Sequence, residues 1–178
     1  MAMIDFTNIN YLKNGNSKQS KAYEVLTSKE MLSKITEFNP ILVGTIPINI
    51  DIENSDLDII CYWENKQKFI KKLNTAFGNE SDFEIQQTLI DNKETIIANF
   101  KTQDFEIEIF GQNIPVNQQN GYRHMIIEYE ILQTKGENFR QEIIKLKQQG
   151  YKTEPAFGLL LGLKGNPYLE LLEYKTIS

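Results

Sequence analysis

The period of the hydrophobic positions changes twice along the chain, from helical spacing to strand alternation and back. Near the start, a short helix is predicted where apolar residues recur at helical spacing, at Ala22, Val25 and Leu26. Thr27 and Glu30 have the three-residue spacing of a capping box, which predicts the start of a second helix. Pro40 prevents that helix from continuing.

Two strands are predicted in the middle of the chain. Segment 41–43 (Ile-Leu-Val) has the composition of a buried strand and ends at Gly44-Thr45. After a loop, segment 56–63 alternates, and the strand period of two places Asp56 and Asp58 on one face. The opposite face then carries Leu57, Ile59, Cys61 and Trp63. The two carboxylates are therefore expected to point the same way.

A helix followed by two or three strands is predicted next. The amphipathic stripe from Phe69 to Phe77 lies between Asn65, a candidate N-cap, and Gly78, a candidate stop. These strands cover roughly residues 83–89, 95–100 and 104–110. The loops between these strands are short, which indicates antiparallel pairs. In the last strand, Phe105, Ile107 and Ile109 alternate with Glu106, Glu108 and Phe110.

The final third of the chain returns to helical spacing. Helices are predicted around residues 122–129 and 139–146, from Pro155 to Leu163, and around 168–174. Strands followed by helices favour an α+β (α/β) fold in one domain spanning residues 1–178. Its small mixed sheet, with flanking helices, covers about residues 36–115, and a helical C-terminal third covers about 119–174.

Composition places the chain among ordinary globular proteins. It has 178 residues, of which 40% are hydrophobic and 24% charged. The net charge of -5 argues against broad binding to an anionic membrane and makes nucleic acid an unlikely partner, although a local basic pocket stays open. Cys61 is the single cysteine, so an internal disulfide is excluded, and its strand position predicts a core residue.

Neither a secretion signal nor a membrane span is visible in the sequence. We therefore expect a cytoplasmic protein. The oligomeric state is left open.

Candidate chemistry gathers at the first two strands. Gly44-Thr45 closes one strand, and Asp56-Leu57-Asp58 opens the next after ten intervening residues, 46 to 55. A glycine at a strand end lets the backbone approach a phosphate, and the neighbouring hydroxyl can bond a phosphate oxygen. Two carboxylates on one face can hold a hard divalent cation, Mg2+ or alternatively Mn2+, together with the phosphates of a nucleotide.

A third carboxylate would complete a two-metal site. Glu106 and Glu108 lie on one face of their predicted strand, so physical reasoning alone allows either residue. Crowded carboxylates repel one another, which raises at least one pKa and makes such a site tighten when a cation binds.

Other polar residues have simpler interpretations. His124 lies near the start of a predicted helix and is interpreted as a surface or capping residue in preference to a base. Arg123 and the lysines at 147, 152 and 164 could neutralise phosphates, but solvated side chains are the expected state.

The residues around Gly44-Thr45 and Ser55-Asp56-Leu57-Asp58 resemble the polymerase-beta-like nucleotidyltransferase superfamily. Its pattern is a hydrophobic residue, Gly, then Gly or Ser, a loop, and Asp-x-Asp/Glu. Within this superfamily, the chain is similar over nearly its whole length to an uncharacterised bacterial family described as a domain of unknown function. The matching stretches include 44–47, 55–61, 108–112, 115–116, 122–125, 152–157 and 167–168.

The resemblance implies particular roles. Asp56, Asp58 and Glu108 would be the catalytic, metal-binding carboxylates, and Gly44 and Thr45 would meet the triphosphate of an NTP substrate. The expected reaction is Mg2+-dependent transfer of a nucleoside monophosphate to an unidentified acceptor hydroxyl. Thr45 stands where the superfamily usually has Ser or Gly, and a glutamate as third ligand is also less usual.

Two alternatives belong to other functional classes. A nucleotidyltransferase-like module that no longer catalyses could bind a nucleotide or a protein as a regulator or antitoxin. A structural domain whose acidic residues only face water would respond to neither Mg2+ nor NTP.

Overall fold

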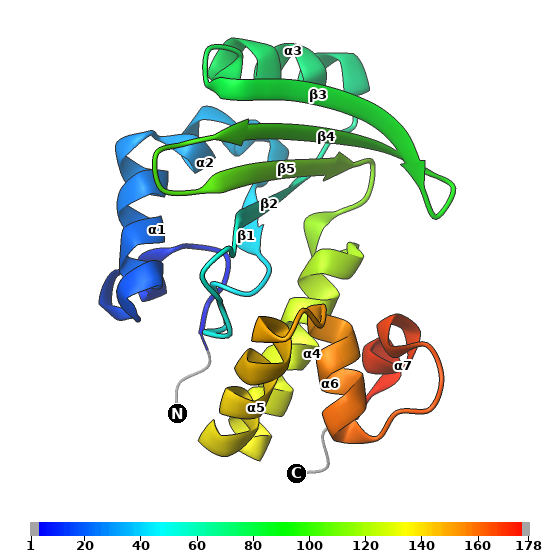
Figure 1. Ribbon diagram of the computed structural model, residues 1–178. Coiled ribbons are helices and arrows are strands. Elements are labelled where there is room, and N and C mark those ends of the chain that lie inside the picture. The colour runs from blue at the N-terminus through cyan, green and yellow to red at the C-terminus, as the bar shows by residue number, and fades with distance from the viewer. Residues whose placement is uncertain (1–3, 176–178) are drawn as a thin grey trace.

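The computed structural model describes residues 4–175 and shows a mixed α/β fold built on one five-stranded sheet (Figure 1). The strands are β1 (Ile41–Val43), β2 (Leu57–Tyr62), β3 (Ser81–Ile90), β4 (Lys93–Lys101) and β5 (Glu106–Gln112). Their order in the sheet is β1-β2-β5-β4-β3. The β2–β5 pair is parallel and the other three pairs are antiparallel.

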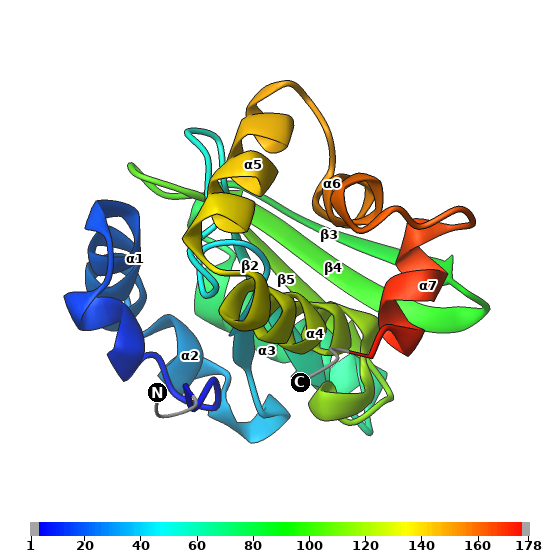
Figure 2. The same ribbon diagram turned by 90° about the horizontal axis from the view of Figure 1, so that it is seen from below.

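Helices cover both faces of this sheet. The α-helices are α1 (Ser17–Ser28), α2 (Met31–Lys34), α3 (Lys66–Phe77), α4 (Asn120–Lys135), α5 (Glu137–Gln148), α6 (Thr153–Leu161) and α7 (Pro167–Glu173). Short 3-10 turns occupy Asn10–Asn14, Thr36–Phe38 and Val116–Gln118. Seen from below, α4 to α7 lie on one side of the sheet and α3 lies on the other (Figure 2). The structure therefore has three layers.

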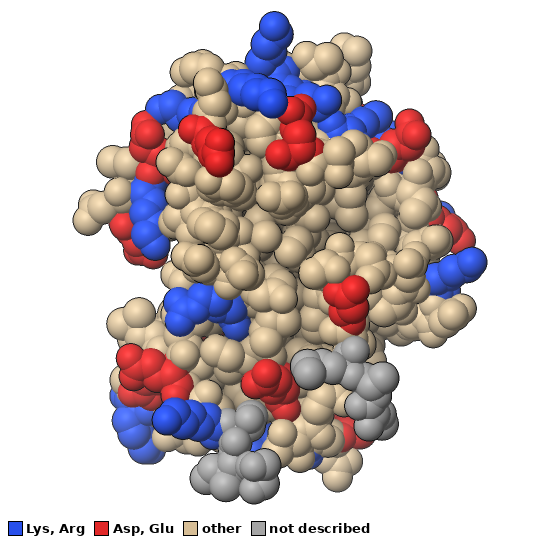
Figure 3. Space-filling model, turned by 180° about the vertical axis from the view of Figure 1, so that it is seen from behind, with Lys and Arg blue, Asp and Glu red and all other residues tan. Residues whose placement is uncertain are grey.

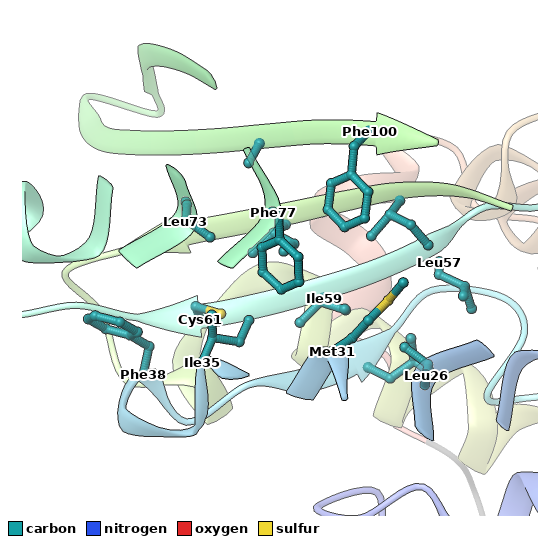
Figure 4. Close-up of a cluster of buried hydrophobic side chains, with 14 of the residues drawn as sticks. Leu26, Met31, Ile35, Phe38, Leu57, Ile59, Cys61, Leu73, Phe77 and Phe100 are labelled. Carbon is teal, nitrogen blue, oxygen red and sulfur yellow. The ribbon is translucent and has the colours of Figure 1, made fainter. Parts of the chain in front are cut away.

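The first hydrophobic core lies under α1, α2 and α3. The alternate residues of β2 that point to this side are Leu57, Ile59 and Cys61. They pack with the apolar stripe of α3, which supplies Phe69, Leu73 and Phe77. Figure 4 shows Met31, Ile35 and Phe38 from the N-terminal segment against the same strand. Cys61 is buried here, as its strand position predicts.

The second core lies between the opposite face of the sheet and the C-terminal helices. Ile41, Val43 and Ile60 meet Met125 and Tyr129 of α4 there. Because β1 sends residues into both cores, its three residues are all buried, as expected for a continuous apolar run. Successive side chains of β2 therefore point alternately towards the first and the second core.

Most elements confirm the sequence expectations, with corrections at their ends. The expected capping box at Thr27 and Glu30 is wrong: α1 continues through Ser28, and the Thr27 hydroxyl donates back to the carbonyl of Tyr23 at 2.7 Å. Glu30 is instead the residue before α2, in a left-handed conformation with φ 53°. The α1 helix begins with a different capping box, between Asn16 and Gln19. A polar side chain inside a helix can bond the preceding turn, which removes its capping role.

The C-terminal ends of two further helices, α3 and α6, differ from the sequence expectation. Gly78 follows α3 as expected but keeps right-handed helical dihedrals, so no left-handed cap is needed. The helix expected to run to Leu163 ends at Leu161, because Gly162 takes a left-handed conformation with φ 71° and ends the turn. Within residues 4–175, no helix is long and apolar enough to cross a membrane.

Candidate active site

A cavity of about 280 Å³ lies between one edge of the sheet and the C-terminal helices α4 and α6. Its floor is formed by the end of β1 and by β2 and β5, and its roof by α4 and the first turn of α6. Gly44, Thr45, Asp58 and Glu108 all line it. Four of the five residues singled out by the sequence therefore meet at one cavity.

The parallel pairing of β2 with β5 brings two carboxylates together. Asp58 is the register partner of Glu108, so the two residues lie side by side on neighbouring strands, which are about 4.8 Å apart in a sheet. The next pair on the same face is Ile60 and Phe110, which continue the cavity floor. Polar and apolar parts of the floor thus follow one another along the strands.

Asp56 and Glu106 occupy a neighbouring hollow. Asp56 comes directly before β2, is exposed, and lines this second cavity together with Glu106 and Glu108. Glu108 therefore belongs to the wall between the two cavities. Glu106 is exposed and its carboxylate lies 3.7 Å from the ammonium of Lys101. Of the two glutamates left open by the strand pattern, Glu108 is the one beside Asp58.

Burial and mutual repulsion perturb these carboxyl groups. Burial, followed by the charges of Asp56 and Glu108, raises the pKa of Asp58 to about 7, whereas Lys147 acts in the opposite direction. The pKa of Glu108 is raised by burial and then by the charge of Asp56. The three carboxylates are thus close enough for their charges to interact, as expected for residues that share a site.

Residues 4–175 contain no group of three or more His, Cys, Asp or Glu side chains already gathered in a metal-binding arrangement. The donor set nevertheless suits a hard cation, because Asp56, Asp58 and Glu108 offer carboxylate oxygens only. Repulsion between ionised carboxylates keeps such groups apart until a cation neutralises them. The chemistry of the three residues therefore fits Mg2+ or Mn2+.

Gly44 is required by its contact with Asp58. Its φ is +84°, a conformation that L side chains rarely adopt. A Cβ at this position would lie 2.3 Å from Oδ2 of Asp58. The glycine therefore lets the β1 backbone approach the carboxylate that the sequence pattern selected.

The loop between β1 and β2 is closed by its own polar groups. The Thr45 and Ser55 hydroxyls lie 3.2 Å apart, and the Ser55 oxygen accepts the backbone N–H of Ile52 at 2.9 Å. The backbone N–H of Ile50 donates to the carbonyl of Thr45 at 3.1 Å. Thr45 is thereby held at the cavity by its side chain and by its carbonyl.

Both helical layers also hold this loop. From α1, Gln19 donates its amide N–H to the carbonyl of Ile46 at 2.8 Å. From α5, Arg140 donates to the carbonyls of Ile48 and Asn49, and Lys147 donates to that of Ile50 at 2.7 Å. Both of these cationic side chains, Arg140 and Lys147, are buried. The loop is therefore fixed between elements that lie far apart in the sequence.

Two expectations for charged residues are corrected here. Lys147 is buried, and burial lowers its pKa to about 8, although the nearby carboxylates of Glu128, Asp51, Asp56 and Asp58 oppose that shift. His124 is not a surface or capping residue. It lies inside α4 and is buried, with Nε2 donating to the carbonyl of Tyr168 at 2.8 Å and Nδ1 3.4 Å from Oε1 of Glu154.

One buried acidic residue of this cavity has no local signal in the sequence. Glu128 of α4 is buried and lines the cavity one turn beyond His124. Burial raises its pKa, the charge of Glu154 raises it further, and Lys147 opposes both. The four-residue spacing from His124 places both on one helix face, but an acidic residue in a polar helix carries no sign of being buried.

Residues 24–174 match the family described as Domain of unknown function (DUF4269). The chain belongs to this family. The matched region contains the candidate site residues from Gly44 to Glu154. No curated protein matches the DUF4269 chain.

Solved structures show which fold the family has. The poly(U) polymerase Cid1 with bound MgGTP is similar at a TM-score of 0.58 and 11% identity, over 83% of this chain and 49% of that one. A cytoplasmic RNA terminal U-transferase is similar at 0.54 and 14% identity, over 86% and 48%. The GLD-2/RNP-8 complex is similar at 0.55 and 14% identity, over 86% and 61%.

The DUF4269 chain therefore has the fold of the polymerase-beta-like nucleotidyltransferases. It spans about half the length of the two uridylyl-adding structures. At these identities the similarity concerns the fold, and the sequence resemblance to the superfamily is confirmed at that level.

Substituting Gly44 by alanine tests the close approach to Asp58. We expect G44A to lower the free energy of unfolding by about 1–3 kcal/mol, because φ is positive and the new methyl displaces the carboxylate. The matched control is G162A, where φ is +71° but no atom lies within 4 Å of the added Cβ. Urea denaturation measures both. An equal loss in both variants would show that only backbone strain matters at Gly44.

The raised pKa of Asp58 predicts a pH dependence of stability. A carboxyl group whose pKa is raised by folding stabilises the fold while protonated, and this contribution is lost as pH rises through the folded pKa, here about 7. In EDTA, we expect the free energy of unfolding to fall between pH 5 and pH 8. Asp58→Asn should flatten this fall, as urea denaturation at several pH values would show. The same slope in wild type and D58N would contradict the assignment.

Proposed function

We propose that this protein is a divalent-metal-dependent nucleotidyltransferase, which transfers a nucleoside monophosphate from an NTP to an acceptor hydroxyl. One observation carries the proposal: in a nucleotidyltransferase fold, the pairing of β2 with β5 sets Asp58 beside Glu108 at a cavity edge where Gly44 comes into contact with Asp58. Three of the residues that the superfamily pattern selects, Gly44, Asp58 and Glu108, are thus neighbours in space.

Each residue has a role in this reaction. Gly44 leaves room for a phosphate group at the end of β1, and Thr45 offers a hydroxyl at the same edge. Asp56, Asp58 and Glu108 would hold Mg2+ or Mn2+. When bound, the cation would neutralise the charge that develops on the phosphate oxygens and activate the attacking hydroxyl.

The protein itself contributes positioning. The β1–β2 loop is fastened by Gln19 on one side and by Arg140 and Lys147 on the other, so Thr45 and Asp56 keep their places at the two ends of the loop. Holding reactants in a productive geometry is a large part of the rate enhancement expected for such a transfer. The buried lysine also offsets part of the negative charge near Asp58.

The proposal names the acceptor only as a hydroxyl group. The similar solved structures include an RNA terminal U-transferase and a poly(U) polymerase. An RNA end is therefore a candidate acceptor, together with a small molecule or a protein side chain. The expectation that nucleic acid is an unlikely partner is therefore not supported. On the face in Figure 3, charges of both signs are interspersed around the rim of the described part, which does not favour broad backbone binding. A cytoplasmic location, where NTPs and Mg2+ occur, fits the proposal.

Binding of Mg-NTP tests the site without an acceptor. At a ligand concentration about a hundred times its Kd, we expect roughly 2.7 kcal/mol of added stability, because only the folded state holds the ligand. E108Q should lose most of this gain, measured by thermal melting with Mg2+ and a non-hydrolysable NTP. E106Q is the matched control, since Glu106 lies on the same strand but is paired with Lys101. Equal losses in the two variants would count against Glu108 as a ligand.

Turnover tests the reaction. We expect the wild type to release pyrophosphate from an NTP in the presence of Mg2+ once its acceptor is supplied, and Asp58→Asn to abolish that release while keeping the fold. Enzyme-coupled pyrophosphate detection with RNA, protein and small-molecule fractions as acceptors would measure it. Unchanged turnover in D58N would rule out the mechanism. Binding of Mg-NTP without release for any acceptor would favour the regulatory module instead.

A further inference from the structure

The helical roof of the cavity carries a second polar group, distinct from the carboxylates of the strands. It consists of Glu128 and His124 on α4 and Glu154 in the first turn of α6. Asp58 and Glu108 lie across the cavity on the strands that form its floor. The roof is therefore separated from the candidate metal ligands but faces the same space.

Glu128 is the residue of this group that lacks a partner. It is 4% exposed, and among the described residues no group donates a hydrogen bond to its Oε1. Buried polar atoms are almost always hydrogen-bonded, so an orphaned carboxyl oxygen at a cavity needs an explanation. A ligand that donates a hydrogen bond would supply one.

The surrounding charges give the chemistry of that ligand. Glu128 and Glu154 bring two carboxyl groups to the same roof of the cavity, and their charges repel each other. Lys147 acts on Glu128 from a distance, but its ammonium already donates to the carbonyl of Ile50. The Nε2 proton of His124 is likewise used by the carbonyl of Tyr168. The roof thus has more acceptors than donors.

We propose that this roof is a subsite for a nitrogen group that donates hydrogen bonds, an amino or ammonium group, with Glu128 as its specificity-determining residue and Glu154 beside it. The group is carried by a ring or short chain that rests on the apolar floor of Ile60 and Phe110. This inference deepens the proposed function, since it names what the transferase recognises next to its reacting carboxylates.

Two parts of the substrates can bring such a nitrogen. One is the exocyclic amino group of adenine, cytosine or guanine on the NTP, which uracil lacks. The other is an amine on the acceptor that carries the attacking hydroxyl. A site built to pair a donor rejects a ligand without one more strongly than an apolar pocket can, because its polar groups are left unpaired.

The experiment uses Glu128→Met, which keeps the length of the side chain but removes both acceptors. Glu130→Gln on the exposed side of α4 is the control. In the first arm, calorimetry compares ATP, CTP, GTP and UTP, each with Mg2+. If the nucleobase is the source, UTP binds the wild type at least about tenfold more weakly than the others, and E128M removes this difference.

The second arm needs neither metal nor nucleotide. Ligand-observed NMR compares glucosamine with glucose, which differ only in the amino group. If the acceptor is the source, the wild type and E130Q bind glucosamine in preference to glucose, and E128M abolishes the preference. Glu154→Gln is measured in parallel and is expected to weaken the same preference. If melting shows that E128M does not fold, E154Q still tests the subsite.

The outcomes separate the two proposals. A change in either arm with E128M or E154Q supports the subsite and names its source. No change in both arms overturns it, whatever the fate of the transferase proposal. Failure of the wild type to bind any Mg-NTP would contradict the transferase proposal alone, because the amino-sugar arm still decides the subsite.

Discussion

The site depends on one structural constraint, the parallel pairing of β2 with β5. This pair is the point where the order of the sheet departs from the order of the chain, because β5 enters between β2 and β4. Its register aligns Leu57 with Ile107 on one face and Asp58 with Glu108 on the other. A shift of β2 by one residue would turn Asp58 towards the first core, where burial of charge is costly. The apolar face thus fixes the position of the acidic face.

The second layer of helices makes this acidic edge a cavity. Without α4 to α7, Asp58 and Glu108 would face solvent, and their charges would be screened by water. Under the helices, burial becomes the largest cause of the raised pKa of Asp58. The same layer holds the β1–β2 loop through Arg140 and Lys147. Closing the cavity and fixing the loop are therefore two effects of one packing interaction.

Much of the local structure follows from the sequence pattern alone. The helix at Lys66–Phe77 with its Asn65 cap, the alternation of β2 and the antiparallel hairpins of β3, β4 and β5 need only neighbours along the chain. Local signals failed where two of them competed, as at Thr27, whose hydroxyl bonds the preceding turn inside α1. Capping patterns depend on where the helix ends, and packing of α1 on the core decides that end.

The sequence by itself determined most of the helices and strands, the position of Asp56 and Asp58 at the start of one strand, and the two candidates Glu106 and Glu108, because these rest on the periods of strands and helices. Only the tertiary structure decided that Glu108 lies beside Asp58, that Gly44 touches that carboxylate, and that His124, Glu128 and Lys147 are buried around the cavity. These facts join residues far apart in the chain. Strand order, register and the docking of the helices set such distances, and no local pattern of residues records them.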